Sequence, residues 1–159
     1  MTNIRQKIEY KKNLAPYLLE LKQLTRTDVS SESLISIEDT EKILKESLHL
    51  KNADRNNFIL DFSEKNSERF KKFIANLSRA NNISVYIWMP KSNMCGLYKA
   101  NSLNTIDFSF PFNINSEGII EFFTEDLKNE LLFDYYYDAD DREMLEIEWQ
   151  GEHWNSVSY

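Results

Sequence analysis

Glycine, proline and cysteine are scarce in this chain, which has three glycines, three prolines and one cysteine among 159 residues. So few glycines and prolines exclude collagen-like and low-complexity classes. The single Cys95 cannot form an intramolecular disulfide, which is typical of a protein kept in a reducing compartment. No stretch approaches the roughly 18 consecutive apolar residues of a membrane span, and the charged N-terminal turns do not resemble a signal peptide. We therefore expect a cytoplasmic protein that does not contact a membrane.

The composition is that of a folded domain. Hydrophobic residues make up 42% of the chain and aromatic residues 13%, and 159 residues fit the usual size of one domain. We expect a single domain over 1–159, with a helical N-terminal part over 1–50 and a mixed sheet over 58–154 that includes one helix over about 64–79.

Helical signals dominate the first part of the chain. The apolar spacing predicts helices over 3–14 and 16–25, separated at Pro16 because proline disrupts a helix interior. A further helix should begin after Ser36, whose hydroxyl can cap it, and should run to about Leu48 with Leu44 and Leu48 facing the core. The helix over 64–79 should be capped by Ser63.

The second part of the chain alternates as strands do. If 58–62 is a strand, it forms a β-α-β unit with the helix over 64–79 and a parallel strand over 83–89. Further strands are predicted over 96–100, 106–110, 118–125, 131–138 and 143–150. The predicted fold class is α+β, with N-terminal helices packed on a mainly antiparallel C-terminal β-meander.

Charge is distributed unevenly along the chain. Residues 1–99 hold 17 Lys+Arg and 12 Asp+Glu, whereas residues 100–159 hold only Lys128 and Arg142 against 14 acidic residues. The formal net charge is −7, which argues against a general nucleic-acid binder because phosphates require a basic surface. The acidic C-terminal part is either a solubilising surface or a patch that meets a basic partner.

Strand periodicity assigns these carboxylates to one face of the predicted sheet, since alternate side chains of a strand point the same way. Leu131 and Phe133 belong to the apolar face, which should pack on the helices. The opposite face and its hairpin turn provide the predicted partner-binding residues Glu121, Phe123, Glu125, Asp134, Tyr136, Asp138, Asp140, Asp141, Glu146 and Glu148. Exposed aromatics among carboxylates are typical of protein interfaces. Alternatively, Phe123 and Tyr136 lie beneath the N-terminal helices and the acids only rim the sheet.

No motif indicates a catalytic or metal site. The segment 138–149 fails as an EF-hand because Glu143 and Trp149 occupy the positions of the required glycine and glutamate. Two histidines and one cysteine cannot form the usual zinc sets, and no glycine-rich phosphate loop is present. We expect no metal, cofactor or catalytic residue. The alternatives are a small enzyme with a carboxylate or Cys95 site in a helix–sheet cleft, and a structural or regulatory adaptor.

Two segments carry a family resemblance: Ile83-Ser-Val-Tyr-Ile-Trp-Met-Pro90, and the stretch from Glu117-Gly-Ile-Ile to Leu145-Glu-Ile-Glu-Trp149. In these segments the chain resembles the immunity proteins of bacterial polymorphic toxin and contact-dependent growth inhibition systems. The likeness covers the C-terminal half best and assigns no residue roles. It implies a stoichiometric inhibitor bound to a cognate basic toxin domain, often a nuclease. The oligomeric state is left open.

Overall fold

The structure is a computed structural model that describes residues 3–52, 54–112 and 115–159. Its α-helices are α1 (Ile4–Thr25), α2 (Ile37–Glu46), α3 (Glu68–Ala80) and α4 (Ser92–Cys95). Its strands are β1 (Asn56–Asp61), β2 (Val85–Trp88), β3 (Tyr98–Ala100), β4 (Ile119–Thr124), β5 (Asn129–Tyr137) and β6 (Glu143–Gly151). Short 3₁₀ turns cover Ser31–Ser33, Ser47–Asn52, Phe62–Asn66 and Leu103–Thr105. Among the described residues, no helix combines the length and apolarity needed to cross a bilayer.

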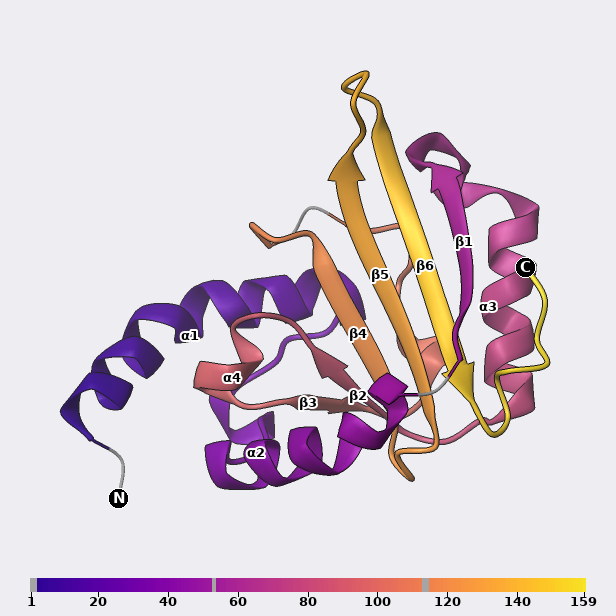
Figure 1. Cartoon of the computed structure of the whole chain (residues 1–159). Coiled ribbons are helices and arrows are strands. Elements are labelled where there is room, and N and C mark those ends of the chain that lie inside the picture. The colour runs from indigo at the N-terminus through magenta and orange to yellow at the C-terminus, as the bar shows by residue number, and fades with distance from the viewer. Residues whose placement is uncertain (1–2, 53, 113–114) are drawn as a thin grey trace.

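The strands form one antiparallel sheet with the order β1-β6-β5-β4-β2-β3 (Figure 1). The helical N-terminal part precedes the C-terminal meander β4-β5-β6, so the predicted α+β class is confirmed. The segment 58–62 does contribute a strand, β1, at one edge of the sheet. The N-terminal half of α1 projects away from the sheet (Figure 1).

The predicted β-α-β unit is only partly right. α3 connects β1 to β2, and these strands point the same way because an even number of antiparallel steps separates them. They are not neighbours, however, since β6, β5 and β4 lie between them. The long β5–β6 hairpin pairs over nine residues and occupies the centre of the sheet, which displaces β1 to the edge.

One face of the sheet is apolar and buried, as the alternation predicts. Phe133 contacts Phe70 of α3, and Trp149 packs edge-on against Phe73 with ring centroids 4.8 Å apart. The irregular segment 103–112 covers the same face through Phe108, which lies 5.7 Å from Phe133 between ring centroids. α1 adds further buried side chains to this core, namely Tyr17, Leu21 and Leu24. Burial of this apolar area is the main source of stability.

The predicted break at Pro16 is wrong, because α1 runs continuously through this residue. Proline removes one helical hydrogen bond, yet its ring is exposed here and hinders no neighbour in the core. The next residue, Tyr17, is fully buried. Its hydroxyl donates a hydrogen bond to the Gly96 carbonyl oxygen at 2.8 Å and lies 2.8 Å from the Ser92 hydroxyl. Tertiary packing therefore outweighs the local cost of the proline.

Helix α2 begins as predicted, since the Ser36 hydroxyl accepts a hydrogen bond from the Asp39 amide. It ends at Glu46, two residues before the predicted end at about Leu48, and a 3₁₀ turn follows from Ser47. The prediction that Leu48 faces the core is wrong, because this side chain is 57% exposed. Helix α3 begins later than predicted. Its cap is Ser67, because residues 62–66 form a separate 3₁₀ turn after β1.

The predicted strand over 106–110 is also wrong. The Asp107 carboxylate accepts hydrogen bonds from the amide and hydroxyl of Ser109, which folds this segment into a turn. The amide of Asp107 donates to the carbonyl oxygen of Leu24 in α1 rather than to a strand. The alternating aromatic side chains of the segment serve instead as a cover for the apolar sheet face.

Candidate functional site

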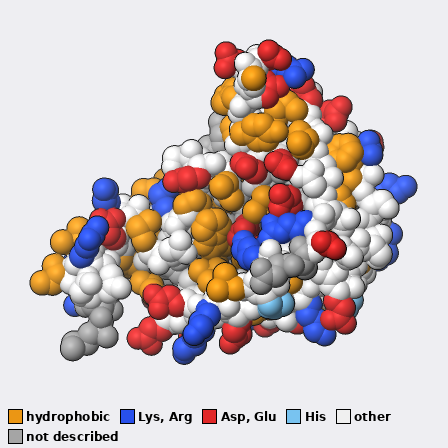
Figure 2. Space-filling view, in the orientation of Figure 1, with side chains coloured by type: hydrophobic (Ala, Val, Ile, Leu, Met, Phe, Trp, Pro, Cys, Tyr) orange, Lys and Arg blue, Asp and Glu red, His pale blue; other side chains and the backbone are white. Residues whose placement is uncertain are grey.

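The face of β4, β5 and β6 opposite α3 carries the carboxylates of the predicted interface. We call it the acidic face. Figure 2 shows acidic side chains on this side of the molecule, flanked by hydrophobic ones and by a few basic ones. The face divides into an inner half near the 47–52 turn and an outer half toward the 138–142 hairpin turn. The two halves differ in how their carboxylates are paired.

The inner half is an ion-pair network. Lys51 Nζ lies 2.7 Å from Glu121 Oε1 and 3.1 Å from Glu130 Oε1. Arg55 reaches Glu130 Oε2 at 3.2 Å and Glu148 Oε2 at 2.6 Å. Three glutamates on adjacent strands are thus bridged by two cations that come from the segment before β1. Because Glu130 is only 1% exposed, this pairing is needed to keep its charge inside the protein.

Burial dominates the electrostatics of this network. Burial raises the pKa of the Glu121 carboxyl, although Lys51 opposes the effect. Burial alone would lower the pKa of Lys51, but hydrogen bonds and attraction to Glu121 and Glu130 outweigh it and hold that pKa above its ordinary value. The carboxylates of the inner half are therefore neutralised by Lys51 and Arg55 of the same chain. They are less available to a basic partner than the sequence predicts.

Phe123 is not the exposed anchor that the sequence predicts. Its side chain is fully buried, and the Lys51 ammonium lies 6.0 Å from the centre of its ring. This burial agrees with the alternative interpretation, a position beneath the N-terminal helices, in that the covering residue Lys51 belongs to the 3₁₀ turn after α2. Tyr136 differs, because it remains half-buried on the outer half.

The outer half consists of Asp134, Tyr136, Met144 and Glu146, with Ile59 of β1 beside them. Asp134 lies directly opposite Glu146 in the β5–β6 register. No described residue provides a cation within ion-pair distance of either carboxylate, and the Glu146 carboxylate accepts a hydrogen bond from the side-chain amide of Asn57. Burial raises the pKa of Asp134, and the charges of Glu146 and then Glu148 raise it further. The two carboxylates of the outer half, Asp134 and Glu146, therefore face each other without a cation from the described residues.

The remaining predicted acids lie at the ends of the sheet. The Asp138 carboxylate accepts hydrogen bonds from the backbone amides of Arg142 and Asp140, and it lies 2.8 Å from the Arg142 guanidinium. The hydrogen bond from the Arg142 amide is the main cause of the lowered pKa of Asp138, and the Arg142 side chain contributes. Asp141 is exposed and adopts a positive φ of 58° in the hairpin turn. Glu125 forms an exposed pair with Lys99 at 3.1 Å. Asp138 and Asp140 order the turn itself.

Sequence reasoning missed three members of the inner half: Lys51, Arg55 and Glu130. Glu130 was detectable, because it shares the alternation of Asp134 and Tyr136 once β5 begins at Asn129 rather than at Leu131. The two cations were not detectable, since they lie 70 to 93 residues before the glutamates they pair with.

Cys95, which the sequence offers as an alternative catalytic residue, has the environment of an unreactive thiol. Its thiol is buried, and burial raises its pKa to about 11. At neutral pH this thiol is protonated, whereas a nucleophilic cysteine requires the thiolate. Among residues 3–52, 54–112 and 115–159, no group of three His, Cys, Asp or Glu side chains has the arrangement of a metal site.

No protein-family model, characterised protein or solved structure matches this chain.

Proposed function

We propose that this protein is a stoichiometric inhibitor that binds and neutralises a cognate basic bacterial toxin domain, such as a nuclease. The outer half of the acidic face is the proposed contact surface. The observation that carries the proposal is the placement of Asp134 opposite Glu146 with no cation from the described residues. Two like charges directly opposite each other destabilise a sheet. A positive charge on a bound partner would remove this repulsion, so the arrangement favours binding of a basic partner.

The inner half supports this proposal by analogy within the same molecule. There, Lys51 and Arg55 bridge glutamates on adjacent strands of the same face. A lysine or arginine of the partner would bridge Asp134 and Glu146 in the same manner and continue the alternation of charge along β5 and β6. Arginine suits this role best because its planar guanidinium can bind two carboxylates at once.

Apolar side chains around the two carboxylates would provide the contact area. Ile59 is 49% exposed and lies opposite Glu146 in the β1–β6 register, while Tyr136 and Met144 are half-buried on the same face of the sheet. Interfaces combine such apolar and aromatic anchors with charges that orient the partner. The excess of acidic residues over 100–159 would speed the approach of a basic partner through long-range attraction.

The experiment is to express the open reading frame immediately upstream with and without this protein. We expect the upstream product to arrest growth and this protein to restore it. The proposal is wrong if the upstream product is harmless or if its toxicity is unaffected by this protein.

A pair of variants tests the contact surface separately. Asp134→Lys combined with Glu146→Lys should abolish protection and slow toxin association at least about tenfold at low salt. Glu32→Lys combined with Glu41→Lys is the matched control, because it changes net charge equally at exposed positions outside the sheet. Equal protection by both variants would exclude the outer half as the contact surface.

A further inference from the structure

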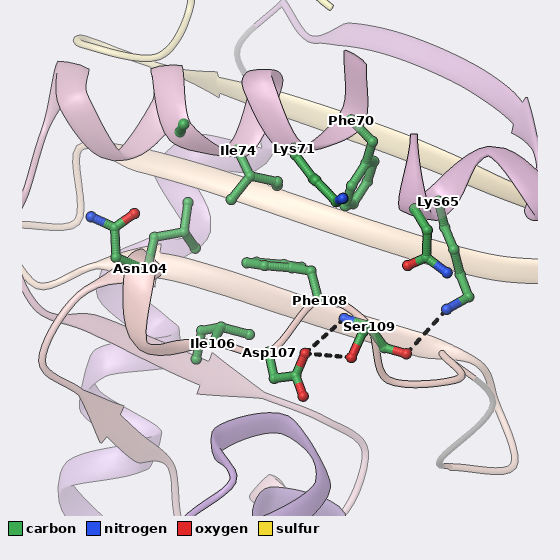
Figure 3. Close-up of a pocket in the computed structure, with 12 residues that line it drawn as sticks. Lys65, Phe70, Lys71, Ile74, Asn104, Ile106, Asp107, Phe108 and Ser109 are labelled. Carbon is green, nitrogen blue, oxygen red and sulfur yellow. Dashed lines mark hydrogen bonds between the residues drawn. The ribbon is translucent and has the colours of Figure 1, made fainter. Parts of the chain in front are cut away.

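A pocket of about 300 Å³ lies between α3 and the segment 103–109, apart from the acidic face. In Figure 3, Phe70 and Ile74 extend from α3 toward the facing segment, which carries Ile106 and Phe108. Leu103 and Ala75 complete the apolar lining. A volume of this size lies at the lower limit of small-molecule sites, which are usually apolar with a few polar groups at fixed positions.

Two lysines stand at the rim of this pocket. Lys65 Nζ donates to the carbonyl oxygens of Ser109 at 3.1 Å and Phe110 at 3.3 Å. These acceptors are neutral, so they orient the ammonium group without cancelling its charge. Lys71 pairs with Glu68 at 3.1 Å, but both side chains are largely exposed, and such surface pairs are weak. The rim therefore offers positive charge to a ligand.

Asp107 also lines the pocket, and its carboxylate already has hydrogen-bond and ion-pair partners within the protein. Its carboxylate accepts hydrogen bonds from the Ser109 hydroxyl at 2.6 Å and the Ser109 amide at 3.0 Å, and it pairs with Arg26, the residue that caps the C-terminal end of α1. The Ser109 hydroxyl is the main cause, with Arg26 contributing, of a pKa near 2 for Asp107. Asp107 thus fastens the segment to α1 and presents little uncompensated negative charge to the pocket.

The geometry points to a binding site for a small amphiphilic anion, namely a medium-chain or aromatic carboxylate. The hydrocarbon part lies between Ile74 and Phe108, where it is removed from water, and the carboxylate meets Lys65 and Lys71 at the rim. This assignment is independent of the acidic face, because no residue belongs to both.

Decanoate is the probe, and isothermal titration calorimetry of the full chain is the measurement. We expect saturable binding of one decanoate per chain below its micellar concentration. Decyltrimethylammonium, which has the same chain length and the opposite charge, should bind at least about tenfold more weakly, because the rim is positive. Absence of saturable decanoate binding would overturn the assignment, as would equal binding of the two amphiphiles.

Substitutions in the pocket lining test whether decanoate binds in this pocket. Ala75 is exposed on α3, so Ala75→Trp can fill the pocket without entering the core, and it should weaken decanoate binding at least about tenfold. Lys71→Glu should weaken binding about fivefold, whereas Lys72→Glu, a matched change outside the pocket, should leave it within about twofold. Decanoate-induced NMR shifts at Phe70 and Phe108 should disappear in the Ala75→Trp variant. Unchanged binding in that variant, or equal effects of the two lysine changes, would overturn the assignment.

Discussion

Asp134 of β5 and Glu146 of β6 lie directly opposite each other, and neither pairs with a cation from the described part of the chain. One pair of residues further along the same face, Leu132 and Glu148, the arrangement changes, because Arg55 reaches Glu148. Charge compensation on the acidic face therefore stops between Glu148 and Glu146. This boundary separates a structural network from a surface that is available to a partner.

Asp134→Asn should stabilise the free protein. The change removes repulsion between opposed like charges, and after allowance for solvent screening we expect a gain of about 0.5 kcal/mol in the free energy of unfolding near neutral pH. Urea unfolding of both proteins measures it. Under the proposed function, the same variant should bind the toxin more weakly, which is the usual sign of a residue retained for binding.

The pH dependence of this gain follows from the raised pKa of Asp134. A carboxyl with a raised pKa in the folded state penalises folding at pH values above that pKa, and the penalty is relieved as the pH falls through it. The advantage of Asp134→Asn should therefore be present near neutral pH and shrink as the pH falls through the raised pKa toward the ordinary value for an aspartate. A pH-independent gain would contradict this explanation.

Arg55→Met should destabilise the protein by about 2 kcal/mol, because it removes one of the two cations paired with Glu130 and also the cation paired with Glu148 in a partly buried site. The control is Lys99→Met, which breaks an exposed pair with Glu125 and should change stability by less than about 0.5 kcal/mol. Urea denaturation of the two variants provides the comparison. Similar small effects would mean that solvent already screens the inner network.

Gly96→Ala should cost at least about 3 kcal/mol or prevent folding. Gly96 has a φ of 100°, and a Cβ atom there would lie 2.0 Å from the carbonyl oxygen of Ile35. The carbonyl oxygen of Gly96 also accepts a hydrogen bond from the Tyr17 hydroxyl, so the loop cannot move away freely. Asn101→Ala, at an exposed position just after β3, is the control and should leave the melting temperature nearly unchanged. A melting temperature of Gly96→Ala close to that of the parent would refute the close approach.

The Cys95 thiol should react slowly with Ellman's reagent in the native protein and rapidly after unfolding in guanidinium. Burial excludes the reagent and raises the thiol pKa to about 11, so the reactive thiolate is scarce. The time course of absorbance measures this difference. Rapid modification of the native protein would show an accessible thiol and would revive the cysteine-enzyme alternative.

Some features followed from local pattern alone. The apolar face of β5 and β6 was predictable from residues such as Phe133 and Ile147, because side chains alternate along a strand and a shift of one residue would expose them all. The Ser36 cap was predictable for a similar reason, since a serine at that position satisfies an otherwise unpaired helical amide.

Other features misled the same reasoning. Ile106, Phe108 and Phe110 alternate as a strand would, yet they form a turn that covers the core. Periodicity reports only that every second side chain is apolar, and it does not report whether a neighbouring strand is present to accept the backbone hydrogen bonds. Pro16 misled in the opposite direction, because packing of Tyr17 keeps α1 continuous.

The sequence by itself determined the α+β class, the alternation of the central strands and the excess of acid after residue 100. Only the tertiary structure decided which carboxylates are compensated, because Lys51 and Arg55 are brought to Glu121, Glu130 and Glu148 by folding. The physical reason is range. Side-chain direction along a strand is set by neighbouring backbone geometry, whereas an ion pair depends on two distant segments meeting within a few ångströms.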